Sequence, residues 1–129
     1  MPMPVITALY AGILGLISIP LAFAAGSKRG KLKVSVGDGG DPELLLAMRR
    51  HANFVEFVPL ALILVALLEL GGVSGTAIHA MGAGLVVARI AHATGLKADT
   101  LSNPGRAIGA AGSTLVILVA SVWAIVNFF

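Results

Sequence analysis

Residues 42–70 read PELLLAMRRHANFVEFVPLALILVALLEL. A helix needs about 20 predominantly apolar residues to cross the hydrocarbon core of a bilayer, and this stretch is long enough to do so. It also carries a block of ionisable side chains between Arg49 and Glu56. Charged groups are costly inside a membrane, so their presence there indicates function by default. We therefore interpret the stretch as a membrane helix that carries a functional site.

The rest of the chain contains three more apolar segments, at residues 5–25, 76–96 and 107–129. Asp41-Pro42 and Asn103-Pro104 are typical helix starts, because each pairs an N-cap residue with a proline at the first helical position. The sequence predicts an all-α fold, an integral membrane four-helix bundle made of one domain over residues 1–129. The expected helices span about 4–26, 42–70, 75–96 and 104–128.

Composition excludes several other classes of protein. The chain has 129 residues, of which 57% are hydrophobic and 12% charged, against about 25% charged in an ordinary soluble domain. Mean hydropathy is +0.97, which argues against a disordered chain and a typical soluble enzyme. The net charge of +3 comes with one Trp and one Tyr, so no nucleic-acid partner is expected. The absence of cysteine excludes disulfides and a thiol nucleophile of the protein's own.

The positions of the basic residues predict the topology. They lie near the first and third connections, whereas the connection at residues 71–75 and both termini are uncharged. The positive-inside rule then places both termini on the non-cytoplasmic side. Ala22-Phe23-Ala24 is similar to a signal-peptide cleavage box, but a basic cluster follows it directly, as after a retained membrane helix.

Alternating helix directions bring the ionisable groups of the last three segments to one layer near the cytoplasm. Its members are Arg49, Arg50, His51, Asn53, Glu56, Arg89, His92 and Arg106. Arg49, Asn53 and Glu56 share a helix face, because they are four and three residues apart. Four arginines against one carboxylate in this layer indicate an anionic ligand, which arginine can bind in a bidentate manner.

The alternative is that such groups only pair with one another or extend to the membrane interface. We expect this for Arg50, Glu69 and Lys97, and a structural role for His79. No metal site is expected, because the histidines lack a metal-binding spacing. Gly105 and Gly109 form a GxxxG pair that permits close helix packing.

The stretch RRHANFVEFVP at residues 49–59 resembles the signature of the MAPEG family, the membrane-associated proteins in eicosanoid and glutathione metabolism. That signature is an Arg, an Asn four residues later, a Glu three after that, then an aromatic residue and a Pro. The matching residues here are Arg49, Asn53, Glu56, Phe57 and Pro59. Arg89 and Arg106 also match family positions, and the resemblance covers nearly the whole chain.

The resemblance implies a homotrimer in a bacterial inner membrane, with glutathione as co-substrate bound between subunits near the cytoplasmic face. Its implied glutathione-binding residues are Arg49, His51, Asn53, Glu56, Phe57, Arg89 and His92. Arg106 falls where the family has the arginine that stabilises the thiolate, and would be the catalytic residue. The implied activity is a glutathione transferase or peroxidase acting on hydrophobic electrophiles that enter from the lipid.

Departures from the family pattern leave two alternatives. Phe57 stands where many members have Tyr, and Tyr10 in the first segment is the only tyrosine of the chain. A non-catalytic scaffold that binds glutathione or lipid is therefore the second hypothesis. A small multidrug transporter is the third, but the first segment lacks the embedded carboxylate that such transporters use.

Overall fold

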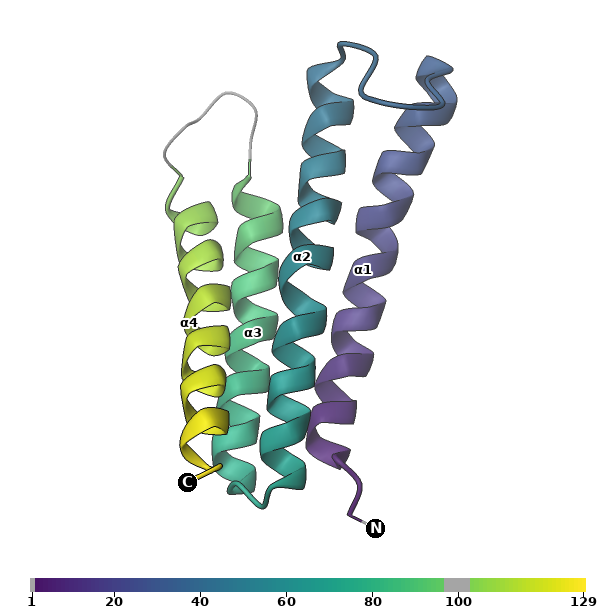
Figure 1. Cartoon of the computed structure of the whole chain (residues 1–129). Helices are drawn as coiled ribbons and strands as arrows, with labels where there is room; N and C mark the ends of the chain where they lie inside the picture. Colours follow the sequence, from purple (N-terminus) through teal and green to yellow (C-terminus); the bar gives the residue numbers. More distant parts are fainter. Residues whose placement is uncertain (1, 97–102) are drawn as a thin grey trace.

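The computed structural model describes residues 2–96 and 103–129, and these residues form four helices packed side by side (Figure 1). The helices are α1 (Val5–Leu32), α2 (Pro42–Leu70), α3 (Gly75–Gly95) and α4 (Pro104–Val126). The predicted all-α fold is confirmed. Both ends of the chain lie at the end of the bundle where α2 connects to α3, and the connection from α1 to α2 lies at the opposite end.

The two predicted helix starts are present. The Asp41 carboxylate accepts a hydrogen bond from the backbone N–H of Leu44 at 2.8 Å. The Asn103 side chain accepts from the N–H groups of Gly105 and Arg106, at 2.9 and 3.4 Å. Each cap satisfies N–H groups that have no partner inside the helix. The second cap also sets the first turn of α4, from which Arg106 projects.

The end of α1 differs from the prediction. The first helix was expected to end near residue 26, but it continues to Leu32, and Lys33 then closes it in the left-handed conformation at φ 55°. Lys and Arg are good helix formers, and Arg29 and Lys31 lie in the last turn, where the helix dipole favours positive charge. The first connection is therefore shorter than expected, and the basic cluster is mostly helical.

Three of the described helices, α1, α2 and α4, are long and apolar enough to cross a membrane. Helix α3 differs because glycines and ionisable residues interrupt its apolar sequence. It packs against all three other helices, whereas α1 and α4 do not touch each other within the described residues. Helix α2 also contacts all three other helices, and the buried ionisable residues of α3 are Arg89 and His92.

A continuous apolar core joins the four helices. Its fully buried members include Leu14, Ala61, Ile78, Leu85 and Ala120. Many large apolar side chains point outward instead, among them Leu16, Phe23, Ile63, Val87 and Ile125. An exposed apolar surface of this extent is typical of a protein that contacts lipid or partner subunits.

Two polar contacts fasten α1 at the end of the bundle where the chain begins. The Glu69 carboxylate accepts hydrogen bonds from the N–H groups of Ile6 and Thr7, at 2.9 and 2.8 Å, and from the Thr7 hydroxyl at 2.6 Å. Glu69 therefore caps α1 and does not extend to the interface as predicted. One turn further along α1, the Tyr10 hydroxyl lies 2.8 Å from His79 Nδ1, the structural role expected for this histidine.

Helices α3 and α4 approach closely through glycines. A Cβ atom added to Gly109 would collide with His92 and with the carbonyl of Ala88. Gly105 is similarly close to Ala91 and Gly95 of α3. The GxxxG pair thus packs within one chain, and it brings the start of α4 against the end of α3.

We predict that Gly109→Ala destabilises the fold by about 1–3 kcal/mol, because the new methyl group overpacks the α3–α4 contact. Gly84→Ala is the matched control, since nothing lies within 4 Å of the methyl group it would add. The control should be neutral or slightly stabilising, because alanine favours a helix over glycine. The free energy of unfolding in detergent measures both, and equal values for the two variants would contradict the close packing.

Candidate functional site

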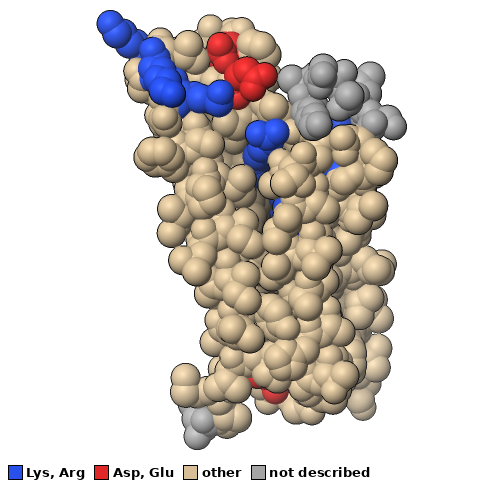
Figure 2. Space-filling model, turned by 180° about the vertical axis from the view of Figure 1, so that it is seen from behind, with Lys and Arg blue, Asp and Glu red and all other residues tan. Residues whose placement is uncertain are grey.

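The charged residues gather at one end of the bundle. Figure 2 shows basic and acidic side chains at the end that holds the α1–α2 connection, with most of the body uncharged. A small acidic spot marks the far end, where α2 finishes with Glu69. Because the Glu69 carboxylate is already bound to α1, the charged end is where a ligand site is expected.

A cavity of about 180 Å³ lies at this end, between α2, α3 and α4. Its lining residues are Arg49, Asn53, His92, Leu96 and Arg106. Four of the predicted site residues therefore come together, one pair from α2 and one each from α3 and α4. Pockets for small molecules usually measure about 300–1,000 Å³, so this cavity holds part of a ligand and not the whole of a tripeptide.

Arg89 lies buried beside this cavity. The residue is only 1% exposed. Its Nη2 donates to Asn53 Oδ1 at 2.7 Å, and its Nη1 donates to Ser113 Oγ at 3.1 Å. The rings of Phe54 and Phe57 lie 5.7 and 6.0 Å from its central carbon, within the range of cation–π attraction. Arg89 therefore links α2, α3 and α4 at one level.

The surroundings of Arg89 are neutral. No carboxylate pairs with it among residues 2–96 and 103–129, and its Nε is sealed without a partner. The Arg89 guanidinium instead donates hydrogen bonds to neutral oxygen atoms and contacts aromatic rings. Of the two roles that the resemblance implied, contact with a carboxylate of glutathione or support of the site, the geometry favours support, because Arg89 does not line the cavity.

Three other predicted residues lie outside the cavity wall. Glu56 is exposed and makes no hydrogen bond with any described residue. His51 is half-buried and points to another side of α2, because two residues turn a helix by about 200°. Phe57 is half-buried against Arg89. The shared face of Arg49, Asn53 and Glu56 thus starts at the cavity and runs onto the outer surface.

Sequence reasoning missed Ser113. Ser113 is fully buried, accepts from Arg89 and donates to the Gly109 carbonyl at 2.9 Å. The available signal was a hydroxyl in an apolar helix, four residues after a glycine. Arg50 was expected to have a structural role, pairing with other groups or extending to the interface, and its Nη2 donates to the Leu96 carbonyl at the end of α3. Lys97, for which the same was expected, lies outside the described residues.

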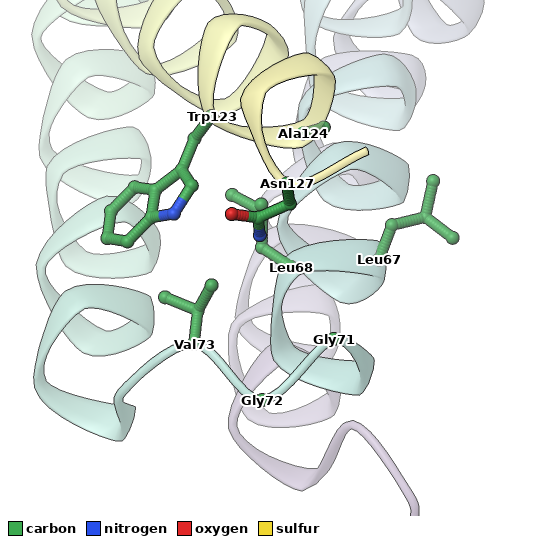
Figure 3. Close-up of a pocket in the computed structure, with 8 residues that line it drawn as sticks. All are labelled: Leu67, Leu68, Gly71, Gly72, Val73, Trp123, Ala124 and Asn127. Atoms are coloured by element: carbon green, nitrogen blue, oxygen red, sulfur yellow. The ribbon is translucent and has the colours of Figure 1, made fainter. Parts of the chain in front are cut away.

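A larger cavity, of about 690 Å³, lies at the opposite end of the bundle (Figure 3). Its lining residues are Leu67, Leu68, Gly71, Gly72, Val73, Trp123, Ala124 and Asn127. The Trp123 indole and the Asn127 amide project from the end of α4 beside the α2–α3 connection. No ionisable side chain lines this cavity, so the smaller, arginine-lined cavity is the better candidate for chemistry.

We predict that Asn53→Ala destabilises the fold by about 1–3 kcal/mol, because it removes a partner of the buried Arg89 guanidinium. Glu56→Ala, one turn away on the same helix face, should change stability by less than about 0.5 kcal/mol because Glu56 is exposed. Denaturation midpoints in detergent compare the two. A larger effect at Glu56 than at Asn53 would show that the Arg89–Asn53 contact does not support the bundle.

The chain matches the model of the MAPEG family over residues 7–126. It is also similar to the inner membrane protein YecN of Escherichia coli strain K12, with 30% identity over 119 residues, which cover 92% of this chain and 91% of YecN. YecN of Escherichia coli O6:H1 matches equally well. The resemblance recognised in the motif at residues 49–59 is confirmed: the chain is a membrane protein and belongs to the MAPEG family.

Proposed function

We propose that this protein is a glutathione-dependent transferase or peroxidase that binds glutathione near the cytoplasmic face of the membrane. The observation that carries the proposal is the cavity lined by Arg49, Arg106, Asn53 and His92, to which residues 2–96 and 103–129 contribute no carboxylate. Two guanidinium groups and an amide at one cavity suit a ligand with carboxylates. Family membership supports glutathione as that ligand.

In the proposed reaction glutathione supplies the sulfur, since the chain has no cysteine. A free thiol has a pKa of about 8.5 and reacts as the thiolate. The Arg106 guanidinium stabilises that anion once the thiol proton has passed to water. The thiolate then forms a C–S bond to the electrophilic carbon, and the leaving group departs with the electrons of the bond that breaks.

The proposal includes a homotrimer with the site at the subunit boundary. The cavity of one chain is small, and Glu56 and the side chain of Arg49 lie at the outer surface. A neighbouring subunit would complete the wall and bring Glu56 into contact with the ligand. All four helices would cross a bacterial inner membrane, with both termini outside the cytoplasm and with lipid supplying the hydrophobic electrophile.

One observation favours a second candidate, a non-catalytic scaffold that binds glutathione or lipid. Tyr10, the only tyrosine, is bound to His79 at the level of the bundle away from the arginine cavity. No phenol among the described residues lines the cavity. Any thiolate stabilisation then depends on arginine, and binding without turnover would support the scaffold.

The test is calorimetric titration of the detergent-purified protein with glutathione, followed by a conjugation assay over a panel of hydrophobic electrophiles. We expect saturable binding, and a loss of about 10–100-fold in kcat for Arg106→Ala, the equivalent of one charge-assisted hydrogen bond. Lys31→Ala is the matched control. It removes one positive charge from the last turn of α1, and Lys31 is not one of the residues that line the cavity.

The outcomes separate the candidates. Turnover that falls with Arg106→Ala but not with Lys31→Ala supports the enzyme. Binding with no turnover over the whole panel supports the scaffold. If wild-type protein and Arg106→Ala turn over equally, Arg106 has no catalytic role, and if glutathione does not bind at all, the proposed function is wrong.

A further inference from the structure

Two residues of the arginine cavity could each offer a ligand either a hydrogen-bond donor or an acceptor. The amide of Asn53 has an oxygen and an NH₂ group, and the neutral imidazole of His92 has one nitrogen of each kind. Which atom faces a ligand decides whether each of these two side chains donates a hydrogen bond to that ligand or accepts one from it. Both side chains contact Arg89, whose guanidinium can donate but cannot accept.

The contact with Asn53 sets the direction of the amide. Arg89 Nη2 lies 2.7 Å from Asn53 Oδ1, so the amide oxygen is held on the side of the buried guanidinium. The Nδ2 group is left on the other branch, with both hydrogens free of any partner in the described residues. Asn53 Nδ2 is also not fully buried. In the described residues, the fully buried side-chain atoms that lack a hydrogen-bond partner are the Nε atoms of Arg50 and Arg89.

The contact with His92 sets the tautomer. Arg89 Nη2 lies 3.5 Å from His92 Nδ1, and because the guanidinium only donates, this contact favours the tautomer in which Nδ1 accepts and Nε2 carries the proton. An imidazolium would have no lone pair to offer and would repel the guanidinium. Nε2 has no partner in the described residues and is not among the sealed atoms. His92 therefore offers the cavity an N–H donor.

A backbone carbonyl at the cavity also receives a hydrogen bond from an arginine. Leu96 lines the wall, and its backbone carbonyl receives a hydrogen bond from Arg50 Nη2. The other two lining residues, Arg49 and Arg106, carry only donors. Among the described residues, the side chains of the cavity wall thus include two, Asn53 and His92, whose acceptor atoms face Arg89.

We propose that Arg89 is a positioning residue that makes Asn53 and His92 present hydrogen-bond donors to this cavity, which suits an acceptor-only group, a carboxylate. It does so without touching the ligand, by holding the Asn53 oxygen and the His92 Nδ1 atom away from it. Resting on the proposed function, this inference assigns a carboxylate of glutathione to the cavity.

The tautomer can be measured without any ligand, by ¹⁵N NMR of the ligand-free protein labelled in its histidines. His92→Gln assigns the His92 signals, and wild-type protein should show the tautomer protonated at Nε2. Arg89→Met, which keeps the length but removes the donor, should release a mixture of both tautomers, and Arg89→Lys should restore the single one. Tyr10→Phe is the control, because it alters the partner of His79 alone.

The outcomes are distinct from those of the proposed function. A wild-type His92 protonated at Nδ1, or an Arg89→Met variant that keeps the wild-type tautomer, overturns the inference even if glutathione binds. If Arg89→Met does not fold, the wild-type spectrum still decides. Failure of glutathione to bind would refute the proposed function and leave the measured tautomer as the test of Arg89.

A second measurement concerns Asn53 in protein that binds glutathione. Asn53→Asp keeps an oxygen for Arg89 but replaces the amide donor with an acceptor, so it should weaken glutathione binding by about tenfold more than Asn53→Ala. Equal or tighter binding by Asn53→Asp would show that the ligand meets an oxygen at this position, contrary to the inference that Asn53 presents a donor.

Discussion

A buried, unpaired guanidinium is the constraint on which the charged half of this bundle depends. Removing such an ion from water costs several kcal/mol unless surrounding groups compensate. Arg89 obtains that compensation from Asn53 on α2, Ser113 on α4 and two phenylalanine rings. Since these partners belong to different helices, satisfying one charge also sets the relative height of α2, α3 and α4, and with it the shape of the cavity.

The close approach of α3 and α4 makes that arrangement possible. Gly109 has no side chain, so α4 can lie directly against Ala88 and His92, which carries Ser113 to the guanidinium and places Arg106 opposite Arg49. At the other end, the Glu69 carboxylate accepts hydrogen bonds from the N-terminus of α1. At one end of the bundle a carboxylate is thus bound to a helix end, and at the other end two arginines line a cavity.

Much of the fold and part of the site could be predicted from residue order alone. The lengths of the apolar segments indicated the helices, and proline after an N-cap residue indicated where two of them begin. The spacing of Arg49 and Asn53 placed them on one face, and both line the cavity. The end of α1 was misplaced because the end of an apolar segment need not be the end of a helix. The charged residues that follow it are good helix formers, so α1 continues through them. Ser113 was missed because a lone hydroxyl has no periodic signal.

By itself, the sequence determined that the chain is helical, that it suits a membrane and that its arginines occupy one layer, because these properties follow from local hydropathy and from the period of the helix. Only the tertiary structure decided which charged side chains bind a helix end, which one is buried and which line the cavity. Arg50 and Glu69 make hydrogen bonds to the ends of neighbouring helices. Arg89 is buried, and Arg49 and Arg106 line the cavity. The reason is geometric: hydrogen bonds act over about 3 Å, and only packing brings side chains from different helices within that distance.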